Sequence, residues 1–161
     1  MRSTGTHIPF TVLAATLCPS LPMAELGMGH YSTPIFNALA RLGRRVLSYE
    51  TNETWLKVFQ PLAHPNHQML LVKDGWENER LEQKWGFVLV DMEPPEARAP
   101  VIRRLSDWAQ VLVLHDTQDP IYGYAPIWPL FKYRADYTFW PTTTAVVSNA
   151  IDVRKFFPGP E

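Results

Sequence analysis

An acidic side chain lies within or soon after each of five short apolar segments. The segments are MAEL (23–26), RVLSYE (45–50), QMLLV (68–72), WGFVLVD (85–91) and QVLVLHD (110–116), and the acids are Glu25, Glu50, Asp74, Asp91 and Asp116. If the segments are parallel strands, their carboxyl ends meet at one edge of a sheet, where α/β proteins bind ligands. Carboxylates gathered there repel one another, so the pattern predicts a ligand, a metal ion or hydrogen-bond donors among them. Capping of the following helices is the alternative role for these acids.

The first apolar segment runs into a glycine turn, AELGMGHYSTP (24–34), in which Gly27 and Gly29 have G-x-G spacing. Glycine lets the backbone approach a ligand closely and adopt conformations that are closed to other residues. Dinucleotide-binding loops carry a further glycine or alanine three residues later, where this sequence has Ser32. The turn therefore predicts a nucleotide-binding loop that lacks part of the dinucleotide fingerprint.

The elements that must position these residues alternate between strand and helix. Helical patterns are predicted at 35–43, 53–63, 76–84 and 96–109, between and after the apolar segments. Two β-rich runs, 136–141 and 143–149, follow with almost nothing between them, which calls for an antiparallel hairpin. The sequence thus predicts an α/β, Rossmann-like fold with a mostly parallel sheet, helices on both faces and a C-terminal antiparallel β-hairpin.

Length and composition favour a single globular domain over residues 1–161. We expect a short N-terminal helical segment (1–21), a core (22–150) and a tail (151–161). The formal net charge of −1 gives no overall attraction to nucleic acid or to an anionic membrane, so neither partner is expected. The lone Cys18 excludes an intramolecular disulfide and fits a reducing, cytoplasmic location.

The glycine turn and the acids together resemble a known family. The pattern E-L-G-x-G at 25–29, the acid Glu50 closing the second strand and the terminal hairpin resemble the class I S-adenosylmethionine-dependent methyltransferases, over residues 22–150. The resemblance implies S-adenosylmethionine as cofactor and methyl transfer to a small-molecule acceptor. The cofactor has no pyrophosphate, which accords with the missing third glycine. A nicotinamide enzyme is the alternative, because it also places an acid about 20 residues after the glycines.

The resemblance also implies roles for the residues around the cofactor. Glu50 would accept hydrogen bonds from both ribose hydroxyls, and Asp74 would receive the adenine amine while Trp76 covers the ring. The glycine turn would carry the remaining contacts: Glu25 would anchor the loop or bind the amino end of the methionine moiety, Gly27 and Gly29 would approach the cofactor, and His30 and Ser32 would face its carboxylate end or the pocket.

Asp91, His115 and Asp116 follow the fourth and fifth strands and are the candidate catalytic residues. VDME and LHDT resemble positions in the metal-dependent small-molecule O-methyltransferases and the cephalosporin-hydroxylase-like group. This likeness implies that Asp91 and Asp116 bind a divalent cation, with magnesium expected from their oxygen ligands. The cation would lower the pKa of an acceptor hydroxyl. His115 is either a further ligand, which would favour manganese, iron or zinc, or a general base. The structural alternative is that His115 points into the sheet and Asp116 caps a loop.

Two interpretations of different kind remain open for the whole chain. The first is a methyltransferase with a small-molecule acceptor, and the second is a non-catalytic interaction module of the same fold. The loop DPIYGYAPIW (119–128) is long and aromatic. It would serve either as a substrate-covering lid or as a surface for self-association into a homo-oligomer.

Overall fold

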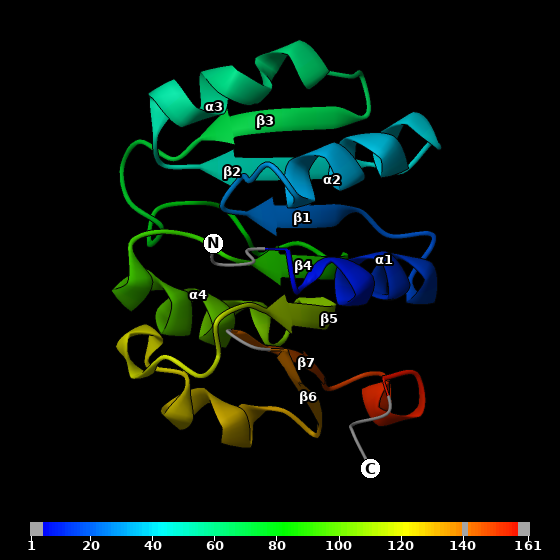
Figure 1. Ribbon diagram of the computed structural model, residues 1–161, viewed down its shortest axis with the longest axis vertical. Coiled ribbons are helices and arrows are strands. Elements are labelled where there is room, and N and C mark those ends of the chain that lie inside the picture. The colour runs from blue at the N-terminus through cyan, green and yellow to red at the C-terminus, as the bar shows by residue number, and fades with distance from the viewer. Residues whose placement is uncertain (1–4, 140–141, 158–161) are drawn as a thin grey trace.

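A seven-stranded sheet runs through the part of the chain that the computed structural model describes, residues 5–139 and 142–157 (Figure 1). The strand order is β3-β2-β1-β4-β5-β7-β6. The strands are β1 (Met23–Leu26), β2 (Val46–Glu50), β3 (His67–Leu71), β4 (Trp85–Val90), β5 (Ala109–Leu114), β6 (Tyr133–Phe139) and β7 (Thr142–Ser148). β1 to β5 pair in parallel, and β7 pairs antiparallel with both β5 and β6. The predicted mostly parallel sheet and C-terminal hairpin are therefore confirmed.

The central strand β4 is buried and apolar on both faces, because helices cover both sides of the sheet. In β4, Phe87 and Leu89 pack into the core under α1 (Ile8–Leu17) and α2 (Ser32–Arg41), whereas Val88 and Val90 face the core under α4 (Arg98–Leu105). α3 (Glu53–Phe59) lies beside β2 and β3 at one end of the sheet (Figure 1). The prediction of helices on both faces is confirmed.

α1 begins directly after His7 and is held at both ends. Pro9 stands in its first turn, where its missing N–H costs no hydrogen bond. At the other end the Arg44 guanidinium donates to the carbonyls of Ala15 and Cys18, both at 2.7 Å, which are carbonyls that the helix cannot satisfy itself. This contact ties α1 to the segment before β2 and so sets where the residues preceding the helix lie.

The predicted helix over 76–84 is wrong, because these residues form turns and irregular structure. Trp76 and Leu81 are buried in the core, and Arg104 of α4 donates to the carbonyls of Trp76 at 2.7 Å and Glu79 at 2.6 Å. Tertiary contacts therefore take up backbone acceptors that a helix would use internally. The stretch also has no apolar periodicity that would favour a helix over this arrangement.

The other boundaries shift by a few residues. The helix predicted over 96–109 starts as the 3-10 turn η2 (Pro95–Ala97) and continues as α4, ending at Leu105. β6 begins at Tyr133, ahead of the predicted run 136–141, whose last two residues lie outside the described residues. Shorter 3-10 turns complete the fold: η1 (Gln60–Leu62), η3 (Pro120–Tyr122), η4 (Ala125–Leu130) and η5 (Val153–Lys155).

The aromatic loop 119–128 packs against the body of the protein. Tyr124 and Ile127 are buried, at 3% and 1% exposure, and η4 contacts α4. Ile121 remains 62% exposed at its tip. The loop is thus anchored at its middle, and its roles as a lid or as an association surface stay predictions. None of the described helices is long and apolar enough to cross a membrane.

Candidate functional site

The glycine turn connects β1 to α2 and contacts the end of β4. Gly27 has φ +90°, and a Cβ atom on it would lie 2.2 Å from the carbonyl oxygen of Asp91. Only glycine tolerates both conditions. Gly29 has no left-handed φ, and its N–H donates to Thr33 Oγ1 at 2.9 Å. The prediction that both glycines adopt a conformation closed to other residues therefore holds at Gly27 alone. There the requirement for glycine comes from the close backbone of Asp91 at the end of β4.

Glu25 is fully buried beneath this turn. Its carboxylate accepts hydrogen bonds from Thr33 Oγ1 at 2.9 Å and from Ser48 Oγ at 2.5 Å. Since Thr33 itself accepts from Gly29, Glu25 anchors the loop through Thr33, which is one of the two roles that the resemblance implies. Burial raises the pKa of Glu25 from 4.5 to about 7, and hydrogen bonds from Ser32 and Ser48 oppose the shift.

The hydrogen bonds of Glu25 continue to His67 on β3. Ser48 Oγ donates to Glu25, so its oxygen accepts from His67 Nε2, 2.8 Å away. Asn37 Nδ2 of α2 lies 3.4 Å from His67 Nδ1. Burial lowers the pKa of His67 to about 4, so the ring is neutral. Among the described residues, every buried polar atom of this group has a partner.

Glu50 closes β2 and faces a cavity of about 330 Å³. Its Oε2 accepts from the Met28 N–H at 3.0 Å, and its Oε1 accepts from the Asn52 N–H at 2.8 Å. These bonds orient the carboxylate. Thr51 Oγ1 also donates to Oε1, at a long 3.4 Å, so Oε2 is the oxygen that keeps a free lone pair for a ligand. The cavity is lined by Gly27, Met28, Glu50, Thr51, Asn52, Trp55, Asp91 and Glu93.

A second cavity, of about 310 Å³, adjoins the first. Its lining residues are His7, Gly29, His30, Tyr31, Ser32, Trp55 and Asp91. Trp55 and Asp91 line both cavities, so they stand where the two meet. Trp55 Nε1 donates to the Met28 carbonyl at 2.7 Å, and the exposed His30 ring packs edge-on against Trp55. Trp55 is missing from the sequence-based site, because its place on the apolar pattern of α3 suggested only core packing.

Asp74 and Trp76 lie apart from these cavities. Asp74 is exposed and lines neither of them, so its contact with adenine stays a prediction. Trp76 is 2% exposed, packs in the core and donates from Nε1 to the Glu93 carbonyl at 2.7 Å. The expectation that Trp76 covers a ligand ring is therefore wrong, because its indole is enclosed by protein.

Asp91, His115 and Asp116 meet at the ends of β4 and β5. Asp91 Oδ1 and Asp116 Oδ2 each lie 3.3 Å from His115 Nδ1. His115 is 3% exposed. Its burial acts to lower its pKa, but hydrogen bonds from the ring to Asp116 and Asp91 outweigh this and raise the pKa to about 9. The structure thus brings the three predicted catalytic residues together and turns His115 toward the two carboxylates.

Arg98 holds this group from the start of α4. Its buried guanidinium donates from Nη2 to Asp91 Oδ1 at 3.0 Å, from Nε to the Met92 carbonyl at 2.7 Å and from Nη1 to the His115 carbonyl at 3.2 Å. Although burial acts to raise the pKa of Asp91, His115 and Arg98 hold it below its usual value. Sequence reasoning missed Arg98, since an arginine in a helical stretch is ordinarily a surface residue.

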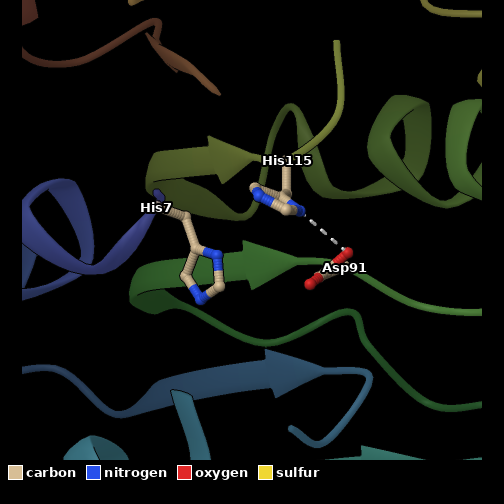
Figure 2. A group of neighbouring side chains, drawn as sticks. All are labelled: His7, Asp91 and His115. Carbon is tan, nitrogen blue, oxygen red and sulfur yellow. Dashed lines mark hydrogen bonds and ion pairs between the residues drawn. The ribbon is translucent and has the colours of Figure 1, made fainter. Parts of the chain in front are cut away.

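His7 joins the same group from the N-terminal segment, and it too was missed. Figure 2 shows its ring beside Asp91 and His115, with the three side chains coming from the start of α1 and the ends of β4 and β5. Its ring centroid lies 4.6 Å from that of His115, with an interplanar angle of 78°. Burial and the charge of His115 lower the pKa of His7 to about 4. Nothing in the local sequence marks this histidine, because only the chain fold brings it to the strand ends.

The sequence matches no family model and no curated protein. Among solved structures, a methyltransferase from Pyrococcus furiosus is similar with a TM-score of 0.64 at 14% identity, covering 94% of this chain and 88% of that one. WbdD is similar with a TM-score of 0.62 at 14% identity over 92% of this chain, which spans 41% of the length of WbdD. The catalytic domain of hMettl16, in complex with the MAT2A 3'UTR hairpin 1, has a TM-score of 0.62 at 10% identity and covers 94% of this chain and 72% of that one.

These likenesses bear on two expectations from the sequence. The net-charge argument against a nucleic-acid partner is not supported, because one of these similar structures holds an RNA hairpin. The strand order, the terminal hairpin and the neighbours agree on the fold. The chain therefore has the fold of the class I S-adenosylmethionine-dependent methyltransferases.

Proposed function

We propose that this protein is an S-adenosylmethionine-dependent methyltransferase. The observation that carries the proposal is the Glu50 carboxylate, which the Met28 and Asn52 N–H groups orient beside the glycine turn, at the wall of a cavity. This carboxylate keeps a free lone pair on Oε2, and its Oε1 has only a long 3.4 Å contact from Thr51 Oγ1 beside the Asn52 N–H. It can therefore accept hydrogen bonds from ribose hydroxyls. The same edge of the sheet is where α/β folds bind nucleotides.

The two adjoining cavities suggest how the cofactor and the acceptor divide the site. Glu50 would hold the ribose in the first cavity, and Gly29 and Ser32 would border the amino-acid end of the cofactor in the second. When bound, the cofactor supplies a sulfonium methyl group for an in-line displacement. Asp91 lines both cavities, which supports a role in aligning an acceptor hydroxyl and in taking up its proton as the methyl group passes from the sulfonium to the acceptor oxygen.

The acceptor that fits best is a small molecule with an oxygen nucleophile. The amino-acid end of the cofactor would take up part of the second cavity, whose whole volume is about 310 Å³, so the acceptor that fits in the remaining space is small. Arg98 anchors Asp91 through its Oδ1 at 3.0 Å, which leaves Oδ2 for an acceptor hydroxyl. Two outcomes would replace the assignment of a small-molecule acceptor. One is methyl transfer to RNA, and the other is binding of the cofactor without turnover.

Isothermal titration with S-adenosylmethionine, S-adenosylhomocysteine and NADH tests the proposal. We expect the two adenosyl ligands to bind and NADH not to bind. Glu50→Ala should weaken S-adenosylmethionine binding by about tenfold or more, because hydrogen bonds to a charged group are lost. Glu53→Ala is the matched control, since Glu53 is an exposed acid paired with Lys57, and it should bind like the wild type. Absence of adenosyl binding by the wild-type protein would overturn the proposal.

A further inference from the structure

His7 is the least satisfied polar side chain at the site. It is 2% exposed, and neither of its ring nitrogens has a hydrogen-bond partner within residues 5–139 and 142–157. An unpaired polar group in the interior costs about 1–3 kcal/mol, and native interiors avoid it. An imidazole that lacks protein partners but lies among other potential ligands indicates that something outside the chain binds it.

The surroundings of His7 have the composition of a metal site. One ligand atom each from His7, Asp91 and His115 lies within 4.8 Å of the others (Figure 2). Asp91 Oδ1 and His115 Nδ1 are 3.3 Å apart, which is long for a hydrogen bond. Metal bonds of about 2.1 Å place two ligand atoms about 3.0 to 3.4 Å apart, depending on the angle at the metal. The observed separation therefore suits two ligands of one ion.

The hydrogen bonds around His115 and Asp91 are compatible with metal binding by both side chains. Thr6 Oγ1 lies 3.1 Å from His115 Nε2, so the ring can donate there from Nε2. Metal binding would displace the proton that Nδ1 shares with the carboxylates and turn the Nδ1 lone pair toward the ion. Arg98 Nη2 donates to Asp91 Oδ1 at 3.0 Å. Metal-binding histidines commonly donate their other N–H to such a partner, and metal-binding carboxylates are themselves hydrogen-bonded.

We propose that His7, Asp91 and His115 bind a divalent first-row transition-metal ion through two imidazole nitrogens and one carboxylate oxygen. This set is not the oxygen-only Asp91 and Asp116 pair that the resemblance implies. Magnesium prefers oxygen ligands, whereas imidazole favours manganese, iron, cobalt and zinc. The second carboxylate, Asp116, lies 3.3 Å from His115 Nδ1 and adds negative charge that attracts a cation.

Three protein ligands leave coordination positions open to a water or a substrate. His7 and Asp91 both line the second cavity, so a molecule in that cavity would border the ion. An acceptor hydroxyl bound there would have a lowered pKa. This last consequence alone rests on the proposed methyl transfer, because metal binding itself does not require it.

Metal titration of the chelator-treated chain, in the absence of S-adenosylmethionine, tests the site. Calorimetry should show one equivalent of Zn²⁺ or Co²⁺ bound, and Mg²⁺ bound much more weakly. The visible absorption of bound Co²⁺ should report nitrogen ligands. His7→Ala should weaken Co²⁺ binding by about tenfold or more, since loss of even an outer-shell partner has effects of that size. His64→Ala removes a histidine outside the group and should leave binding unchanged.

Three results would overturn the site: no transition-metal binding by the wild type, equal binding by His7→Ala, or Mg²⁺ bound as tightly as Zn²⁺. His7→Gln is the second variant should His7→Ala fold poorly, with thermal unfolding in the presence of chelator as the folding control. Failure of S-adenosylmethionine binding with metal binding intact would remove the proposed function and leave the metal site standing.

Discussion

At the β1–β2 half of the sheet edge, Glu25 and Glu50 each accept two or more hydrogen bonds from the protein. At the β4–β5 half, Asp91 and His115 meet at a long 3.3 Å contact, and His7 beside them has no partner for either ring nitrogen among the described residues. In the first half Glu25 has protein partners alone, and backbone N–H groups fix the Glu50 carboxylate before any ligand binds, so this half is preorganised. The second half retains unused binding capacity, which is a property of a site that meets its ligand from outside.

The two halves also differ in how they hold charge. Glu25 is buried among neutral donors and has a pKa raised to about 7, whereas Asp91 is paired with charged groups and has a pKa below its usual value. Neutral hydrogen bonds allow Glu25 to take up a proton, while Arg98 and His115 keep Asp91 ionised. The difference separates a structural acid under the loop from an acid that stays available to a cation or an acceptor.

The largest loss of stability is expected when Arg98, which pairs with Asp91 in the second half, is replaced. Arg98→Met leaves Asp91 without its guanidinium partner and frees the carbonyls of Met92 and His115. Breaking a buried ion pair at one partner costs about 3–5 kcal/mol, which denaturant unfolding measures. Arg103→Met is the control, because Arg103 is exposed on the same helix. Equal losses in both variants would contradict a specific role for Arg98.

Two glycine variants measure how much the close contact between the glycine turn and the end of β4 costs in stability. Gly27→Ala would combine a positive φ with a Cβ 2.2 Å from the Asp91 carbonyl oxygen, whereas Gly43→Ala has a similar φ of +92° and no atom within 4 Å. A left-handed backbone alone costs about 1–2 kcal/mol. We expect about that loss at Gly43 and about 3 kcal/mol or more at Gly27, because strain and close contact add. Similar free energies of unfolding for the two variants would show that the contact with Asp91 is relieved cheaply.

The smallest effect expected is a pH dependence of stability that comes from Glu25 in the first half. The pKa of Glu25 is raised from 4.5 to about 7 in the folded protein, so the folded state holds its proton more tightly than the unfolded state. The stability from Glu25 is present below pH 4.5 and is lost as pH rises toward 7. Glu25→Gln stays neutral, so its free energy of unfolding relative to the wild type should rise by about 2 kcal/mol over this window, at 1.4 kcal/mol for each pH unit as an upper limit. A difference that stays constant with pH would mean that Glu25 is ionised throughout.

Much of the scaffold could be predicted because its signals are local. The apolar runs at 85–91 and 110–116 contain the buried strands β4 and β5, and the adjacent runs near the C-terminus form the antiparallel pair. Parallel strands end at a common edge, so Asp91, His115 and Asp116 could be expected together there. The helix expected over 76–84 failed for the opposite reason, since Arg104 and burial of Trp76 decide that stretch from elsewhere in the chain.

The sequence by itself determined the fold class, the glycine turn and the acids at the strand ends, because periodicity and turn chemistry act between neighbours in the chain. Only the tertiary structure decided that Gly27 is required by the backbone of Asp91, that Trp76 belongs to the core and that Arg98 is buried. It also brought His7 to His115, 108 positions further along the chain. These contacts join residues far apart in sequence, and no local pattern records which distant side chain will complete a buried site.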